Sequence, residues 1–386
     1  MKRIAPAVGM GVAAVLILCT LIVARQPQCW IRYVRALVQG PDVPLSFYQP
    51  RELVEGGNRA PAPRVAPALE MLNAGPLQEA ADYAAKFDSN ALIVTRHGHI
   101  VFERYWHGSD FNTLIDSQSF MRTLNAVLVG VALDARKIGW PDEPIGYLLP
   151  QWSHDPRGAI TIRNLLQMSS GLAPAGARAP FATDIASEAL HRRQVGTPGS
   201  SWADQPADTD LVAMALERAA QERYAEYLSD ALWRRLGAAD AWLWLDRPGG
   251  MAHADCCLMA RQGDWVRLGE LLTEGGRFEG DEVVAPKWVA QMLVPARGNS
   301  SYGSGLQLKP GKAAEAYALP GVFAVEGRGN RMWLVPSMSL VILRTGGALA
   351  GDWDDARIPN LIIRGARDYV PPAPRPGDLR SLVPNH

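Results

Sequence analysis

The sequence predicts an α+β fold, in which helices and strands both contribute to the core. The first observation is a pair of β-rich runs within 91–105 that flank a turn at His97-Gly98, as in a β-hairpin. The second is a helix from about 119 to 137, whose apolar residues recur at helical spacing and which ends before Gly139. The third is a set of three predicted strands near 322–326, 331–335 and 340–345.

Composition indicates a globular protein without a strongly charged partner. The chain has 386 residues, of which 48% are hydrophobic, enough for a sizeable core in one large domain or two ordinary ones. Lys plus Arg and Asp plus Glu both number 39, so the formal net charge is zero. This balance gives no reason to expect nucleic acid or an acidic substrate as a partner.

The N-terminal segment predicts a membrane anchor. Residues 4–24 are uncharged and mostly apolar, which is roughly the 20 residues that a helix needs to cross a bilayer. A cleavable signal peptide is the alternative, but Ile22 and Ala24 fit a cleavage site poorly. We therefore expect residues 1–25 to be an uncleaved anchor through which the protein associates with the membrane.

Two further segments have the composition of connecting regions. Residues 26–75 are rich in Pro, Arg and Gly and are interpreted as a tether and an extension lying on the domain. Residues 371–386 form a Pro-rich tail. The expected domain therefore covers residues 76–370, and a helix is predicted over 253–273.

Ser119 stands at the N-terminal end of the predicted 119–137 helix. Free backbone N–H groups and the helix dipole favour a developing negative charge at this position, so a serine here can act as a nucleophile. A serine before a helix can equally be an N-cap, which is the commoner role.

The sequence around Ser119 favours the nucleophile. The stretch from Ser119 to Asp134 resembles the nucleophile helix of the β-lactamase-related serine hydrolases, which begins with Ser-x-x-Lys and ends with Val-Gly-x-Ala-x-Asp. This family includes class C β-lactamases, penicillin-binding proteins, esterases and 6-aminohexanoate-dimer hydrolases. Residues 160–172 and Pro198-Gly199-Ser200, with the downstream Thr-Asp-Leu, resemble its next motifs in the same order.

The resemblance implies a β-lactamase/transpeptidase-like fold. Such a fold has an antiparallel sheet flanked by helices, an inserted all-helical lobe, and a cleft between lobe and sheet. The family usually works outside the cytoplasm, so the resemblance also implies an extracytoplasmic, periplasmic domain. It implies acyl transfer, in which a serine attacks a carbonyl and a neighbouring basic group takes its proton.

All three family elements other than the serine are altered. Arg122 stands at the position of the family lysine, and Asp204 at that of the tyrosine that follows Pro-Gly. Glu326 falls near the Lys/His/Gly-x-Gly motif of the strand that edges the cleft, although a shift of one or two residues would bring Gly327 there. A guanidinium stays charged at any relevant pH, so Arg122 cannot replace the lysine as a base.

The altered positions leave alternatives open. Arg122 is either a surface arginine pointing away from the cleft or a cation paired with an anion. Asp204 is either a plain loop aspartate or a carboxylate that faces Ser119. We expect Arg122 and Asp204 to form an ion pair, with Glu326 as the competing anion and His253 as a less favoured replacement base.

The other candidate ligands predict neither a cofactor nor a metal site. His97, His99 and His107 are close in sequence, but a solvated turn and strand edge explains them better than a metal. Cys256 and Cys257 are adjacent, and no Cys-x-x-Cys or Cys/His ligand spacing appears. Neither a zinc site nor a disulfide framework is therefore expected.

Two functions fit these observations. The first is a membrane-anchored serine hydrolase that uses Ser119, with modified base positions, on a small-molecule or peptide-like ester or amide. The second is a catalytically silent module of the same fold that binds a ligand or partner outside the cytoplasm. The retained Ser119 favours the first, and the loss of both lysine and tyrosine favours the second.

Overall fold

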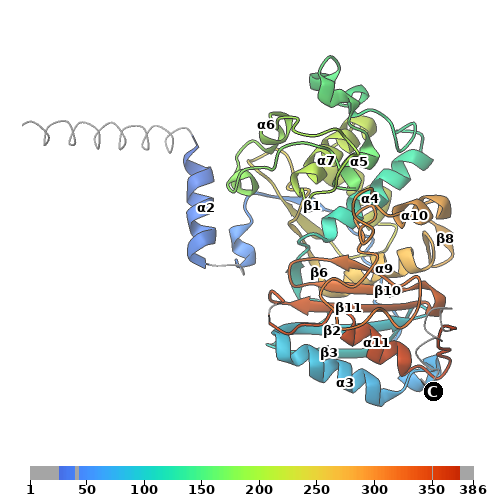
Figure 1. Ribbon diagram of the computed structural model, residues 1–386. Coiled ribbons are helices and arrows are strands. Elements are labelled where there is room, and N and C mark those ends of the chain that lie inside the picture. Colours follow the sequence, from blue (N-terminus) through green and yellow to red (C-terminus); the bar gives the residue numbers. More distant parts are fainter. Residues whose placement is uncertain (1–25, 40–42, 350, 374–386) are drawn as a thin grey trace, which may run out of the picture.

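The computed structural model describes residues 26–39, 43–349 and 351–373, and an antiparallel five-stranded sheet forms its base (Figure 1). The strand order is β3-β2-β11-β10-β9. The predicted hairpin and the three predicted C-terminal strands are all present in this sheet. The bounds are β2 Ser89–Arg96, β3 His99–Tyr105, β9 Phe323–Glu326, β10 Arg331–Val335 and β11 Leu340–Gly346. The predicted α+β class is confirmed.

Alternating side chains of the sheet enter two separate cores. On one face, Leu92 and Val94 of β2 pack with the helices α3 (Ala74–Ala84) and α11 (Arg357–Arg364). On the other face, Ile93 packs in the main core with α4 (Phe120–Asp134) and α9 (Trp265–Thr273). The sheet is therefore covered on both sides, as its nearly continuous apolar sequence requires.

A second antiparallel sheet, in the order β1-β5-β6-β4, adjoins the main core. Its strands are β1 Arg51–Val54, β4 Leu114–Asp116, β5 Ala241–Trp244 and β6 Leu258–Arg261. The predicted 253–273 helix is therefore wrong in its first half, because the residues of β6 pair with both β5 and β4. Within segment 26–75, β1 pairs with β5 along its whole length.

Helices form a lobe above the sheets (Figure 1). It contains α5 Ile162–Leu166, α6 Ile185–Leu190, α7 Ala207–Ala220 and α8 Tyr224–Leu228. Thr161 caps α5 in a capping box with Asn164. Asp208 and Asp210 lie inside the first turn of α7 and are buried, so they do not cap that helix as its sequence suggests. The remaining elements are β7 Arg277–Phe278, β8 Asp281–Glu282 and α10 Pro286–Met292.

The predicted membrane anchor requires correction. Residues 1–25 lie outside the described residues, as does most of the Pro-rich tail. Within the described residues, no helix is both long and apolar enough to cross a bilayer. The first described helix, α2 (Pro27–Gln39), contacts the segment after β5, where Arg32 Nη1 donates to the carbonyl oxygen of Asp246 at 2.8 Å. The prediction of a single-pass, extracytoplasmic protein is therefore withdrawn.

Helix α4 is buried on almost every side, as its sequence predicted. Gly130 lies where α4 meets α10. A Cβ atom at this position would overlap the side chains of Trp288 and Val284. Trp288 is held in place, since its indole N–H donates to the carbonyl oxygen of Ala126 at 2.8 Å. The Val-Gly-x-Ala-x-Asp pattern thus has a packing cause in this chain.

We predict that Gly130→Ala destabilises the protein by about 1–3 kcal/mol, because Trp288 cannot move without losing its hydrogen bond. Urea unfolding followed by tryptophan fluorescence measures this change. Gly75→Ala in α3 is the matched control, since no atom lies within 4 Å of its added Cβ. Equal unfolding midpoints for the two variants would contradict the packing explanation.

Candidate active site

Strand β4 delivers the chain to Ser119. Its residue Asp116 pairs with Met259 of β6, and a short turn through Ser117 and Gln118 then leads into α4. Gln118 has a φ of +50°, a left-handed conformation that costs free energy for a residue other than glycine. Ser119 occupies the N-cap position, but its side chain makes no capping hydrogen bond. Its hydroxyl is therefore available for another role.

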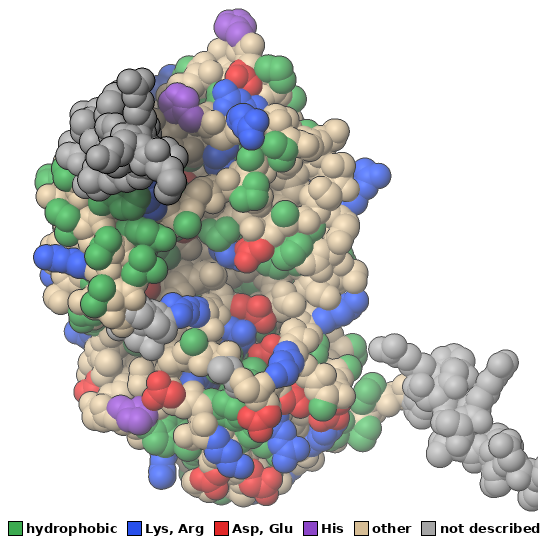
Figure 2. Space-filling model, turned by 60° about the vertical axis from the view of Figure 1, so that its left-hand side comes forward, with side chains coloured by type: hydrophobic (Ala, Val, Ile, Leu, Met, Phe, Trp, Pro, Cys, Tyr) green, Lys and Arg blue, Asp and Glu red, His purple; other side chains and the backbone are tan. Residues whose placement is uncertain are grey.

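The start of α4 lies between the sheet and the lobe. On the sheet side, the N–H of Gly329 in the β9–β10 turn donates to Gln118 Oε1 at 3.0 Å. On the lobe side, Arg122 reaches Asp204, which precedes α7. Figure 2 shows the molecule hollowed between the lobe above and the sheet below. Ser119 is half-buried at this position.

Arg122 and Asp204 form the expected ion pair. Arg122 Nη1 lies 2.9 Å from Asp204 Oδ1. The arginine side chain is 14% exposed and the aspartate side chain 60% exposed, so solvent reaches the pair from the side of Asp204. Arg122 therefore turns into the cleft, and the alternative of an outward-pointing surface arginine is wrong.

Arg122 has further polar neighbours that sequence analysis missed. Burial opposes its charge, but Tyr302, Asp204 and Asp255 together raise the pKa of Arg122, so it stays a cation. Burial raises the pKa of Tyr302 to about 12, so it stays neutral. Tyr302 belongs to a loop that approaches α4 closely, since a Cβ on Gly305 would lie 2.6 Å from the carbonyl oxygen of Arg122. The glycines that follow Tyr302 were the one feature of the sequence that could have indicated this close approach to α4.

Asp255 and His253 line a cavity of about 230 Å³ beside the ion pair, together with Asp204, Asp210 and the loop 174–180. Burial raises the pKa of Asp255 to about 6, although Arg122 opposes this shift. Burial lowers the pKa of His253, so its imidazole is neutral at pH 7. His253 is thus close to the altered cleft, as a replacement base would have to be.

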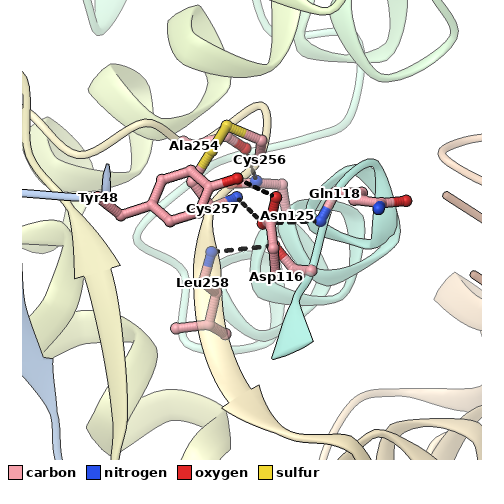
Figure 3. Close-up of a disulfide and its surroundings, with 9 residues drawn as sticks. Tyr48, Asp116, Gln118, Asn125, Ala254, Cys256, Cys257 and Leu258 are labelled. Carbon is pink, nitrogen blue, oxygen red and sulfur yellow. Dashed lines mark hydrogen bonds between the residues drawn. A yellow bond between two sulfur atoms is a disulfide. The ribbon is translucent and has the colours of Figure 1, made fainter. Parts of the chain in front are cut away.

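Cys256 and Cys257 form a disulfide between neighbouring residues, which corrects the expectation of no disulfide (Figure 3). The pair adjoins β6, and Cys257 N–H donates to Asp116 Oδ1 at 3.1 Å. Tyr48 Oη donates to the other oxygen of this carboxylate, Oδ2, at 2.8 Å. The disulfide is thereby fixed against the turn that carries Ser119. Spacing rules miss it because they treat adjacent cysteines as unlikely partners.

Glu326 ends β9, the edge strand of the large sheet. Its carboxylate lies 3.7 Å from Arg331 of the neighbouring strand, so Asp204 and not Glu326 is the direct partner of Arg122. Gln307 pairs with Ala324 through two backbone hydrogen bonds of 2.8 Å. The chain itself thus occupies part of the edge along which the family places its substrate.

The remaining sequence candidates lie elsewhere. His97 and His99 both contact Glu70, at 2.6 and 2.7 Å, while His107 lies near Asp88. A cavity of about 530 Å³ extends from His97 to α9 and the β7–β8 hairpin, and includes none of Ser119, Arg122 or Asp204. Its volume is larger, but Thr273 and Ser339, the hydroxyl residues that line it, belong to none of the family motifs, so we place the chemistry in the Ser119 cleft.

The fold agrees with comparisons to known proteins. The sequence model of the family described as Beta-lactamase matches residues 77–345, which is more than half of the chain. The chain belongs to this β-lactamase-related family of hydrolases.

Individual relatives are distant. The 6-aminohexanoate-dimer hydrolase of Paenarthrobacter ureafaciens is 24% identical over 286 residues, which cover 66% of this chain and 72% of that protein. A structure from Bacillus anthracis, provisionally named a 6-aminohexanoate-dimer hydrolase, has a TM-score of 0.66 at 16% identity. The match covers 83% of this chain and 90% of that protein's chain. FmtA from Staphylococcus aureus has a TM-score of 0.61 at 13% identity, and the match covers 83% of this chain and 96% of the FmtA chain. These structural likenesses establish the fold alone.

A double-mutant cycle tests how the charge of Arg122 is balanced. We predict that Arg122→Met costs about 3 kcal/mol, because it leaves the buried Asp255 without its cation. Asp204→Asn costs less than about 1 kcal/mol, because Asp204 is mostly exposed and screened by water.

Urea unfolding of both single variants and of the double variant measures the coupling between them, which we expect to be below about 1 kcal/mol. An Asp204→Asn variant as unstable as Arg122→Met would show instead that Asp204 alone balances the arginine.

Proposed function

We propose that this protein is a slow serine hydrolase that acts on a small-molecule or peptide-like ester or amide through Ser119. The observation that carries the proposal is the placement of Ser119. It is the half-buried N-cap residue of a buried helix, between lobe and sheet, with a side chain that makes no capping bond. A serine retained only for structure would be expected to cap α4.

The groups around Ser119 allow the reaction but are expected to make it slow. The N-terminus of α4 stabilises negative charge on the attacked carbonyl oxygen. Arg122 supplies a permanent cation and cannot accept the proton of Ser119. A carboxylate must take that proton, and Asp204 is the candidate at the family's tyrosine position. Arg122 lies 2.9 Å from this carboxylate and competes with Ser119 for it.

We predict Ser119-dependent hydrolysis of p-nitrophenyl acetate and no detectable turnover of penicillin. The loss of a positioned acid–base group places the ester rate roughly 10²–10⁴-fold below that of a serine–lysine enzyme of this family. Release of p-nitrophenol measures the rate, and mass spectrometry after treatment with a fluorophosphonate locates the label. Ser119→Ala abolishes both signals, whereas Ser153→Ala, which removes an exposed serine, leaves them unchanged. Label on any other residue would refute the assignment.

The Arg122–Asp204 ion pair also supports a second candidate, a silent module that binds an ester-like or amide-like ligand. In this case two complementary changes replaced a titratable amine and a phenol with a fixed cation and anion. The joint change gives each new charge a direct partner at 2.9 Å, on the side of the cleft that water reaches. Their joint occurrence is expected if the cleft was kept folded after its base was lost.

The double change Arg122→Lys with Asp204→Tyr separates the two candidates. If the module is silent, the wild-type protein and both single variants lack Ser119-dependent esterase activity, and the double variant gains it. Adding Ser119→Ala to the double variant removes the gain, which shows that the restored chemistry uses this serine. Wild-type activity that exceeds that of the double variant would favour the working hydrolase instead.

A further inference from the structure

Three potential metal ligands meet beside the cavity of about 230 Å³. One ligand atom each from His253, Asp255 and Cys256 lie within 4.8 Å of one another. A nitrogen, a carboxylate oxygen and a sulfur form a mixed set that suits a zinc ion, whose bonds to such atoms are about 2.0–2.3 Å long. Their spacing is therefore within a small adjustment of a shared metal position.

His253 is fixed in position and has spare capacity. Its ring stacks on Trp244 with 3.6 Å between ring centroids, and the backbone N–H of His253 donates to the carbonyl oxygen of Trp244 at 2.9 Å. The side chain is buried, with only 1% of the residue exposed, and Nε2 has no hydrogen-bond partner among the described residues. A buried ring nitrogen without a partner costs free energy that a ligand would recover.

The cavity supplies a further donor and open space. Asp210 lines the same cavity and interacts with Asp255, and its Oδ1 has no hydrogen-bond partner within the described part of the chain. A fourth position can therefore be filled by Asp210 or by a water molecule. None of the described residues that line this cavity is a lysine or arginine, and the nearby cation Arg122 pairs directly with Asp204.

The disulfide decides whether the sulfur can take part. While Cys256 is bonded to Cys257, its sulfur cannot become a thiolate, which is the form that binds metals. We propose that reduction of this disulfide converts His253, Asp255 and Cys256 into a site for a thiophilic transition metal, zinc above all. The site would adjoin the Ser119 cleft, because Asp204 lines the same cavity, but none of its three ligands takes the proton of Ser119 in the proposed hydrolysis.

The chemistry balances with an external dithiol as reductant. Thiolate attack breaks the Cys256–Cys257 bond through a mixed disulfide, and the dithiol closes into its own cyclic disulfide. The protein gains two electrons and two protons as two thiols. Metal binding then displaces the proton of the Cys256 thiol, which leaves as the thiolate forms its bond to the ion.

The sulfur and nitrogen donors determine the kind of metal. Mg²⁺ and Ca²⁺ take oxygen ligands and gain little from a thiolate or an imidazole. Zn²⁺ and Co²⁺ accept all three donor types in tetrahedral geometry. We therefore expect the reduced protein to select these ions over magnesium and calcium.

The full-length protein with Cys257→Ser tests the proposal, because this variant leaves Cys256 as a free thiol without any reductant. Titration with Co²⁺ should produce the thiolate-to-cobalt charge-transfer absorption of a cysteine-bound ion, and competing Zn²⁺ should remove it. Cys256→Ser is the matched control, which also lacks the disulfide and keeps Cys257. It should bind at least roughly 10–100-fold more weakly, since even outer-sphere partners contribute that much to metal affinity.

Wild-type protein provides a second measurement if the Cys257→Ser variant does not fold. Protein reduced with dithiothreitol and desalted anaerobically should bind Co²⁺ with the same absorption, and the oxidised protein should not. His253→Ala in reduced protein should lose the signal. Equal affinity in the oxidised and reduced proteins, or in Cys256→Ser and Cys257→Ser, would overturn the proposal. The readout does not depend on hydrolysis, so Ser119→Ala must bind the metal normally.

Discussion

The rest of the cleft depends on the positive charge of Arg122 in the first turn of α4. A cation at the N-terminus of a helix opposes the helix dipole, and this side chain is also mostly buried. Its charge is tolerated because acidic groups converge on it from three separate parts of the chain. These are Asp204 from the lobe, Asp255 from the segment before β6, and Glu326 from the edge of the large sheet. The arginine therefore links lobe and sheets electrostatically.

This arrangement separates two properties that the family usually combines in one lysine. A buried lysine is both a balancing cation and, after losing its proton, a base. Arg122 retains only the first property, so any proton acceptor must come from the surrounding carboxylates. The pKa of Asp255, raised by burial to about 6, shows that these carboxylates are not uniformly weak bases. The cleft has thus kept its charge balance while its proton chemistry has changed.

The sequence predicted those features that depend on neighbouring residues. The β2–β3 hairpin follows from two β-rich runs around a turn, and α4 follows from its apolar spacing. Thr161 caps α5 through contacts within four residues. The Arg122–Asp204 pair was predictable because a buried charge needs a partner, and two motif positions had changed together.

Features that depend on distant residues could not be predicted. Tyr302 and Asp255 reach Arg122 from irregular segments without any periodic pattern, so nothing in their own sequence indicates a place in the cleft. The helix predicted over 253–273 is wrong at strand β6, because pairing with β4 and β5 overrides the local preference of these residues for a helix. The Cys256–Cys257 disulfide joins adjacent residues, so the spacing of cysteines along the sequence could not indicate it. The anchor prediction concerned residues outside the described part of the chain.

The pairing of β1 with β5 has a practical consequence for dividing this chain. The family match begins at residue 77, but β1 covers one edge of the four-stranded sheet, and Tyr48 donates to Asp116 on its far strand. A fragment cut at the family boundary would leave the edge of β5 bare, and an uncovered strand edge is a template for aggregation. It would also remove a hydrogen bond from a carboxylate three residues before Ser119. The limits of sequence similarity are therefore narrower than the limits of the folding unit.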